Sequence, residues 1–303
     1  MADSFPSRGS QKGVNLERSN IMEIKTRAFR HEDLEACLEV EKAAIKGDNH
    51  YLKDVEDYYR TTRGELTVVE VDGKIAGMGK LTVLFDGSAW LELLRVHPEY
   101  QRRGCGMAIY KRYMEQIEEM GCPAARMYTG ARNVPSAALA ERHGLHRSTE
   151  FHGMTLTLDR ADASLFWEPP MYRRLNGDEA IMELLPMKEQ LGGYLGINQT
   201  YYEINEETLR GFAAAGWIYG DGKGNVLVAG SRFQPNKALY IAAMKGDKRR
   251  ALSYALNMMV MAGHQKIAAH FPVGEGAQEL IEFYAKHGFE QNPSDLVVME
   301  LKK

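Results

Sequence analysis

The chain has 303 residues, of which 44% are hydrophobic and 26% charged, and its formal net charge is −3. This size and composition are typical of a soluble globular protein with about two domains, and the charge disfavours a dedicated nucleic-acid-binding protein, which needs a basic face. The three cysteines show no paired spacing, so the sequence indicates neither a disulfide framework nor a thiolate metal site and fits a reducing cytoplasm. We therefore expect small-molecule or peptide partners, no nucleic acid, no membrane and no metal, and a monomer or homodimer.

The first residues carry no recognisable targeting signal. Residues 1–21 are polar and mixed in charge, without the apolar stretch of a secretory signal, and we expect a disordered leader. No window approaches the roughly 18 uninterrupted apolar residues of a transmembrane helix. The folded part is expected to start near Met22.

From Met22 onward the pattern predicts a strand, two helices and then further strands. Residues 23–29 alternate in polarity, and residues 32–44 place apolar side chains at helical spacing. Residues 66–85 contain two β-rich runs joined at Asp72-Gly73, a dipeptide typical of a tight hairpin turn.

The remaining elements of the first half follow in order. The pattern predicts a strand over 89–96, a helix that begins near Gly106 and stops at Gly121, a strand over 124–130, a helix over 135–144 and a closing strand over 151–158.

Two short patterns recur along the chain and indicate a tandem duplication. The "VDGKIAG" turn around Gly73 returns as "GDGKGNVLVAG" around Gly222, and "LAERHGL" around Gly144 returns as "EFYAKHGF" around Gly288, at nearly the same interval. Common turn and helix-end sequences are the alternative explanation. We expect domains over 22–160 and 163–303, with a linker around Pro169-Pro170.

The stretch "VHPEYQRRGCGMA", residues 96–108, connects the strand over 89–96 to a helix. A helix that starts beside Gly104 and Gly106 directs unpaired backbone N–H groups to one point, and glycine lets a phosphate approach the main chain closely. Arg102 and Arg103 add positive charge. The pattern favours a phosphate-bearing ligand but matches neither the nucleotide-hydrolase loop nor the dinucleotide fingerprint.

The same stretch resembles motif A of the GNAT superfamily of acyl-CoA N-acyltransferases, matching at Gln101, Gly104 and Gly106. A later segment, "NVPSAALAERHGL", resembles another family segment at Asn133, Ser136, Leu139 and Gly144. The resemblance covers about residues 22–160. It implies an α/β (α+β) fold in which helices flank a mixed, mostly antiparallel central sheet, present here in two tandem copies.

The resemblance also implies where acetyl-CoA binds. The loop amides would hold the pyrophosphate, the strand over 89–96 would splay open to bind the pantetheine arm, and the Leu94 amide would donate to the thioester carbonyl. The implied coenzyme-binding residues are Leu94, Arg95, Val96, Gln101, Arg102, Arg103, Gly104, Cys105, Gly106, Met107, Asn133 and Ser136.

Glu92 is the candidate general base. An amine with a pKa of about 10.4 is mostly protonated at neutral pH and must lose a proton before it attacks a thioester. Glu92 lies on the strand expected to splay, and by the two-residue period it shares a face with Leu94. An ion-paired strand glutamate is the equally weighted alternative.

The general acid is missing from its usual place. The tyrosine that many relatives use falls at Ala140 here, while Tyr284 occupies the corresponding position of the second copy. A thiolate, with a thiol pKa of about 8.5, can leave with little help, or Tyr128 or the second half can supply a proton. The second copy reads "KGDKRRALSYA" where the first has its glycines, so we expect a degenerate domain that does not bind coenzyme A.

Three further features have structural and functional explanations. His143, His146 and His152 lack the spacing of a metal site. Cys105 is either a reactive thiol at a helix N-terminus or packing filler, and the carboxylates between Glu32 and Asp57 either attract a cationic amine or solubilise helix surfaces.

The sequence thus predicts an N-acetyltransferase that moves an acetyl group from acetyl-CoA to a primary amine of a small molecule or peptide in a ternary complex. A non-catalytic coenzyme A-binding regulatory or scaffold protein is the alternative, favoured by Ala140 and by the degenerate second half.

Overall fold

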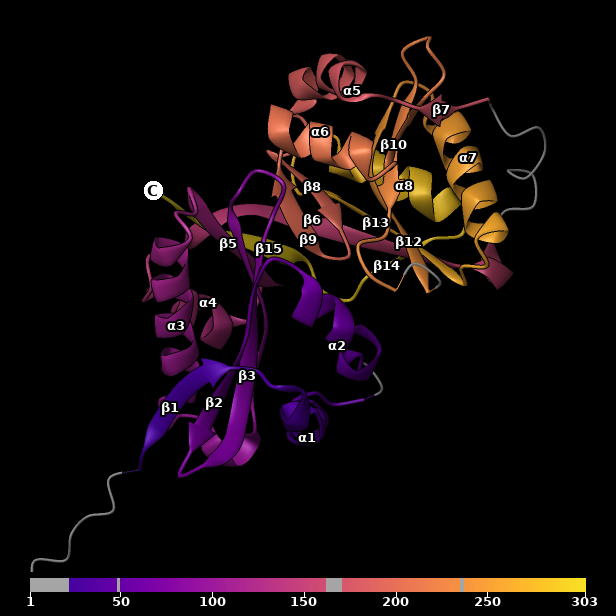
Figure 1. The fold of residues 1–303 in the computed structure, drawn as a ribbon. Coiled ribbons are helices and arrows are strands. Elements are labelled where there is room, and N and C mark those ends of the chain that lie inside the picture. The colour runs from indigo at the N-terminus through magenta and orange to yellow at the C-terminus, as the bar shows by residue number, and fades with distance from the viewer. Residues whose placement is uncertain (1–21, 48–49, 162–170, 235–236) are drawn as a thin grey trace, which may run out of the picture.

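The computed structural model describes residues 22–47, 50–161, 171–234 and 237–303. The expected leader, residues 1–21, and the linker prolines Pro169 and Pro170 lie outside these ranges. Within the described residues, thirteen strands form one continuous sheet that runs through both halves of the molecule, and two more form a separate hairpin (Figure 1).

The first half follows the predicted order of elements. Its strands and helices are β1 (Ile24–Ala28), α1 (Leu34–Ala44), α2 (Leu52–Thr61), β2 (Gly64–Val71), β3 (Lys74–Val83), β4 (Ala89–Val96), α3 (Cys105–Glu119), β5 (Ala124–Gly130), α4 (Val134–Glu141) and β6 (His146–Thr157). The hairpin between β2 and β3 turns at Asp72 and Gly73, whose φ angles are 50° and 78°, so this prediction is confirmed.

Helices cover both faces of the first-half sheet. One apolar cluster joins α1 and α2 to β2, β3 and β4 through residues such as Val40, Val55 and Val68. The cluster on the opposite face joins α3 and α4 to the same strands through residues such as Ile109 and Val69. Val68 and Val69 point to opposite faces, as strand alternation requires.

The second half repeats this organisation with a small hairpin inserted. Its elements are β7 (Arg173–Arg174), α5 (Gly177–Leu184), β8 (Tyr194–Ile197), β9 (Thr200–Glu203), α6 (Glu206–Ala214), β10 (Ile218–Gly220), β11 (Val226–Gly230), β12 (Ala238–Lys245), α7 (Lys248–Met261), β13 (Lys266–Pro272), α8 (Ala277–Lys286), β14 (Glu290–Gln291) and β15 (Leu296–Lys302). Strands β12 and β13 are parallel and joined by α7, as β4 and β5 are parallel and joined by α3.

The two halves exchange their closing strands. Strand β6, predicted to close the first half, pairs with β13, β14 and β15, all from the second half. Strand β15, at the end of the chain, in turn pairs with β5 of the first half. The predicted boundary near residue 160 is therefore a division along the chain that the sheet itself crosses.

The β8–β9 hairpin lies between the two halves, with β8 against β12 and β9 against β5 (Figure 1). Its aromatic residues join a cluster that also contains Trp90 and Phe151 of the first half. Within the described residues, no helix is both long and apolar enough to cross a bilayer.

Candidate active site

The amino-terminal end of α3 is open toward solvent. Gly104 is its N-cap in the left-handed conformation, with φ of 98°, and no side chain caps the helix. The first turn contains no acidic residue. The first backbone hydrogen bond of the helix is donated by Ala108 N to Gly104 O at 2.9 Å. The preceding amides at the helix start are thus available to an anion, and the helix begins at Cys105, next to the predicted start near Gly106.

The equivalent helix of the second half is closed. Asp247 is the N-cap of α7, and its carboxylate accepts a hydrogen bond from Arg250 N at 3.1 Å. No residue with a side chain fits at position 246 without displacing Asn225, because a Cβ there would lie 2.3 Å from Asn225 Oδ1. A carboxylate at this helix end repels a phosphate, which gives a physical reason for the expectation that the second copy lacks a coenzyme site.

Strand β4 separates from its neighbour as the resemblance implied. It pairs with β5 only at Ala89 with Ala125 and Trp90 with Arg126, so the strands diverge from residue 91 onward. On the other side, the register with β3 passes over Leu93 and Leu94, with Leu93 at φ of 58°. This bulge removes the Leu94 amide from the regular ladder at the point where the two parallel strands open.

Gly79 permits the bulge, since it alone stands opposite Leu93 and Leu94. A Cβ at Gly79 would lie 2.1 Å from the Tyr113 hydroxyl, which donates to Glu92 O at 3.0 Å. Helix α3 therefore supports the irregular part of β4 through one side chain that only glycine accommodates.

The bulge corrects one prediction. Leu94 packs in the cluster on the α3 side, while Leu93 packs on the α2 side, where Glu92 contacts Tyr59. Glu92 and Leu94 therefore do not share a face, because the bulge interrupts the two-residue alternation on which that prediction depended.

Glu92 is ion-paired with a residue from the second half. Arg232 Nη2 lies 2.6 Å from Glu92 Oε1 and Nη1 lies 2.9 Å from Oε2, and both side chains are at least nine-tenths buried. Thr82 Oγ1 donates to Glu92 Oε1 at 2.7 Å. This arrangement favours the ion-paired alternative, because the carboxylate oxygens are already engaged by strong donors.

Aromatic rings surround the Arg232 guanidinium. It lies 5.4 Å from the ring centre of Tyr58 and 5.6 Å from that of Phe233, and its Nε donates to the Tyr58 hydroxyl at 2.8 Å. Burial lowers the pKa of Arg232, but the charge and hydrogen bonds of Glu92 together with the neighbouring tyrosines outweigh burial, and the net shift of the pKa is upward. Arg232 is therefore a cation held between α2 and β4.

The hairpin tip fixes the loop that carries Arg232. Asn198 Oδ1 accepts from Arg232 N at 2.7 Å, and Asn198 Nδ2 donates to Phe233 O at 3.2 Å. The next residue, Gln199, accepts a hydrogen bond from the Tyr128 hydroxyl at 3.0 Å. The second half therefore contributes directly to the surroundings of β4 and β5.

Sequence reasoning missed Arg232 and Gln199. Arg232 is 140 positions from Glu92, and no motif around it announces an ion pair. The available signal was the hairpin itself, since Asn198 and Gln199, with φ of 49° and 56°, separate two β-rich runs.

The other predicted coenzyme-binding residues line the approach to α3. Gln101 Nε2 donates to Val96 O at 3.1 Å, and Arg95 Nη1 donates to Leu94 O at 3.0 Å. Arg102 and Arg103 are exposed, with Arg103 over the Tyr100 ring at 5.8 Å. These side chains shape the loop while leaving two guanidinium groups facing solvent.

Asn133 and Ser136 form a helix cap. Asn133 is the N-cap of α4, and its Oδ1 accepts from Ser136 N at 3.3 Å. Cys105 is buried, and burial raises the pKa of its thiol, which favours packing filler over a reactive thiol.

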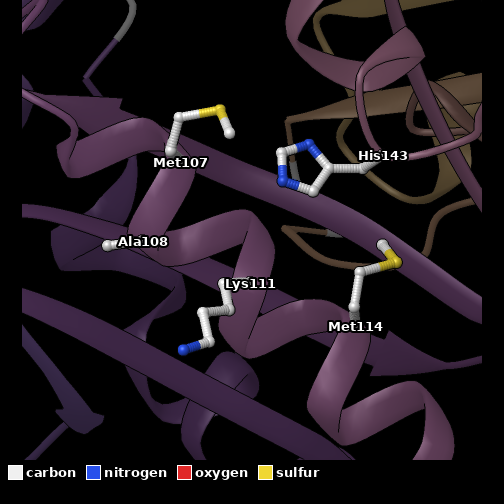
Figure 2. Close-up of a pocket in the computed structure, with 5 residues that line it drawn as sticks. All are labelled: Met107, Ala108, Lys111, Met114 and His143. Carbon is white, nitrogen blue, oxygen red and sulfur yellow. The ribbon is translucent and has the colours of Figure 1, made fainter.

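An apolar hollow of about 410 Å³ lies beside the first turns of α3. Figure 2 shows Met107, Lys111 and Met114 along one side of the helix, with the His143 ring opposite them. His143 stacks on Tyr110 with ring centres 4.6 Å apart. Met107, in the first turn of α3, lines the hollow.

Three carboxylates of α1 and α2 are engaged by other residues of the chain. Glu41 is buried and accepts from Leu52 N at 3.1 Å, which caps α2. Glu56 pairs with Arg60 at 3.3 Å, and Asp54 pairs with Lys237 at 2.5 Å. These contacts favour structural roles over attraction of a cationic substrate.

Neither Ala140 nor Tyr284, the two residues at the position of the family's tyrosine, can donate a proton near β4. Ala140 is a residue of α4 whose side chain is fully buried in the apolar cluster on the α3 side. Tyr284 is buried in the second half and stacks on Phe271, with ring centres 5.7 Å apart. Among the described residues, no group of three or more His, Cys, Asp or Glu side chains could hold a metal ion.

Comparison with known proteins gives matches for the first half and for the whole fold. Residues 21–145 match the sequence model of the Acetyltransferase (GNAT) family. The [Ribosomal protein bS18]-alanine N-acetyltransferase of Escherichia coli K12 is 28% identical over 141 residues, which cover 45% of this chain and 91% of that protein.

Two solved structures match both halves. A GCN5-related N-acetyltransferase from Sphaerobacter thermophilus has a TM-score of 0.61 and 16% identity, over 92% of this chain and 95% of that one. A tandem GNAT protein from the clavulanic acid biosynthesis pathway has a TM-score of 0.57 and 15% identity, over 92% of this chain and 98% of that one. At these identities the likeness concerns the fold, including its tandem arrangement.

Proposed function

We propose that this chain, whose residues 21–145 match the GNAT acetyltransferase family, transfers an acetyl group from acetyl-CoA to a primary amine of a small molecule or peptide in a ternary complex. The observation that carries the proposal is the open end of α3 directly after a bulged strand that has separated from β5. The first feature suits a diphosphate and the second suits an extended amide-containing arm.

We place the parts of acetyl-CoA along this path. The amides after Gly104, with Arg102 and Arg103, would hold the pyrophosphate, and the main chain of Leu94 to Val96 would bind the pantetheine arm. The hollow between Met107 and His143 would take the adenosine end, with Lys111 available to a phosphate. The Leu94 amide, which the bulge frees from the ladder, would donate to the thioester oxygen as charge develops there.

Glu92 acts as a general base only if Arg232 releases it when the acceptor binds. In the described conformation Glu92 instead anchors Arg232, and through it the second half, beside the thioester end of β4. The base hypothesis and the anchor hypothesis make different predictions for substitutions of the pair, which are given in the Discussion.

The experiment has two stages. Calorimetric titration with coenzyme A first tests binding, and release of free thiol from acetyl-CoA then tests transfer with a panel of amines. The panel includes polyamines, aminoglycosides and a peptide with an amino-terminal alanine, the last because the Escherichia coli relative is named for an alanine of a ribosomal protein. If thiol is released faster with an amine than without one, the result supports the assignment of the chain as an acetyltransferase.

The alternative is a coenzyme A-binding protein that does not transfer. It is favoured by the ion-paired state of Glu92 and by the alanine at position 140. Binding of coenzyme A with no amine-dependent thiol release across the panel would support it.

A further inference from the structure

Two side chains occupy matching positions where β4 and β5 separate. The last parallel pair is Trp90 with Arg126, and Glu92 and Tyr128 each lie two residues further along their strands. By alternation both are on the face of Trp90. The Tyr128 ring confirms this, since it stacks on Trp90 with centres 6.3 Å apart and planes 10° apart.

Each of these side chains is held by a residue of the second half. Arg232 binds Glu92, and Gln199 accepts the hydrogen bond of the Tyr128 hydroxyl at 3.0 Å. Asn198 connects the two, because it precedes Gln199 and binds the main chain of Arg232. The opening between the strands therefore has an oriented hydroxyl on the β5 side, fixed by the hairpin tip.

The Tyr128 hydroxyl carries its proton before the reaction begins. Burial raises its pKa, so the group is neutral and carries its proton at physiological pH. The side chain nevertheless keeps partial exposure, unlike Tyr113 and Tyr201, which are fully buried. Of the three positions considered for an acid, Ala140 has no ionisable group and Tyr284 is enclosed in the second-half core, which leaves Tyr128.

We propose that Tyr128 donates the proton to the sulfur of coenzyme A as it leaves, and that Gln199 of the second half is the positioning residue, which accepts the Tyr128 hydrogen bond until the hydroxyl turns to the sulfur. This inference rests on the proposed function and adds a residue to it. It also assigns the second half a part in catalysis, through the hairpin inserted between the halves.

The proposed step balances in atoms and charge. The neutral amine attacks the thioester carbon and forms the C–N bond, and the C–S bond breaks with its electron pair on sulfur. Tyr128 transfers its proton to that thiolate, and the resulting phenolate takes up the proton that the attacking nitrogen gives up. The products are the N-acetyl amine and the free thiol, with Tyr128 restored.

The first test measures the acidity of the bound thiol and needs no acceptor. Coenzyme A is bound to the full chain, and the ultraviolet absorbance of its thiolate is titrated against pH, with the protein alone as blank. A hydroxyl that donates to sulfur stabilises the thiolate, so Tyr128→Phe is expected to raise the bound thiol pKa by about one to two units. Tyr201→Phe is the matched control, because within the described residues the Tyr201 hydroxyl has no hydrogen-bond partner.

The second test measures dependence on the leaving group. Turnover is followed with the best amine of the panel and two small donors, an alkyl thioacetate and p-nitrothiophenyl acetate, whose aromatic thiol leaves without protonation. Tyr128→Phe is expected to lower kcat with the alkyl donor by about 10²- to 10⁴-fold and to have much less effect with the aryl donor. Gln199→Leu should show a smaller loss of the same kind, because the Tyr128 hydroxyl is then no longer held at the opening.

The outcomes separate this inference from the proposed function. Equal thiol pKa values in the parent chain and Tyr128→Phe, at equal affinity for coenzyme A, would overturn the role of Tyr128 and leave the acetyltransferase intact. Equal losses with both donors would also overturn it. Absence of coenzyme A binding in the parent chain would overturn both, and a change in Tyr201→Phe as large as that in Tyr128→Phe would attribute the effect to packing.

Discussion

The guanidinium of Arg232 donates two hydrogen bonds, of 2.6 and 2.9 Å, to the carboxylate of Glu92. One residue belongs to the loop after β11 and the other to β4, so the pair joins the two halves beside the place where β4 leaves the ladder. A buried, bidentate pair of this kind fixes geometry, and removal of one partner leaves an uncompensated charge.

Substitutions of this pair test what Glu92 does. Glu92→Gln leaves Arg232 buried without its anion, so we expect a loss of about 3–5 kcal/mol in the free energy of unfolding. Arg232→Met should cost a similar amount, and the double variant should cost less than the sum of the two. Denaturant unfolding of the three variants measures the coupling.

Activity of the same variants separates the two hypotheses for Glu92. If Glu92 anchors Arg232, the double variant should keep turnover within about tenfold of the parent. If Glu92 is the base, both variants that contain the Glu92→Gln substitution should lose about 10²- to 10⁴-fold, whatever their stability.

The open end of α3 can be closed by one substitution. Gly104→Asp places at this N-cap the residue type that Asp247 supplies in the second half. Its carboxylate would lie beside the expected diphosphate, so we expect affinity for coenzyme A to fall about tenfold more than in Gly104→Asn. Calorimetry at two salt concentrations makes the comparison.

Gly104→Asn is the matched control, because both substitutions strain the same backbone at φ of 98° and differ only in charge. The difference between the two variants should shrink at high salt. Equal affinities at low salt would show that no anion approaches this helix end.

Local signals in the sequence were sufficient for most elements of the first half. The Asp72-Gly73 turn, the alternating strands and the glycines around α3 each depend on neighbouring residues, and the structure has them close to the predicted positions. The exchange of β6 and β15 had no such signal, since a strand's own residues favour pairing without specifying which half provides the partner.

In the candidate site, too, the features that could be predicted are those that depend on residues close together in the sequence. The uncapped helix start at Gly104 could be predicted because its geometry depends on residues that are consecutive in the sequence. The shared face assigned to Glu92 and Leu94 was wrong because a bulge depends on tertiary support, here the Tyr113 hydroxyl over Gly79. Arg232 and Gln199 could not be predicted, since they reach the site through folding of the second half.

Arg126 joins β5 to three other segments through ion pairs. These ion pairs should make the free energy of unfolding depend on pH in the acid range. It is almost fully buried and binds Asp86 at 3.0 Å, Glu300 at 2.6 Å and also Glu203. Burial opposes ionisation of Asp86 and Glu203, but their hydrogen bonds and neighbouring cations outweigh it and lower both pKa values.

Because the pKa values of Asp86 and Glu203 are lower in the folded state, acidification lowers the free energy of unfolding. The stabilisation from Asp86 and Glu203 is present above their unfolded pKa values of about 4 and is lost as pH falls through the lower folded values. Arg126→Gln should cost about 3–5 kcal/mol at pH 7, and acidification should then destabilise this variant less than the parent. Urea unfolding at pH 7 and at about pH 2–3, below the unfolded pKa values, measures both effects.

Arg173→Gln serves as the control for Arg126→Gln, because Arg173 pairs with Glu179 on the surface. It should leave the urea midpoint unchanged within error. An Arg126→Gln variant as stable as this control would contradict the assigned role of the network.

The Cys105 thiol should be unreactive in the folded protein. Burial raises its pKa, and Cys37 and Cys122 are buried with raised pKa values as well. Iodoacetamide at neutral pH should therefore modify Cys105 far more slowly in the native state than in urea. Mass spectrometry of quenched samples follows the reaction, and native labelling as fast as in urea would show that the helix end activates this thiol.

The most direct test of the account is the stoichiometry of coenzyme A binding to the full chain, measured by calorimetry. The account predicts one coenzyme per chain, because the N-terminus of α3 is open and that of α7 is capped by Asp247. Absence of binding, or two coenzymes per chain, would contradict it.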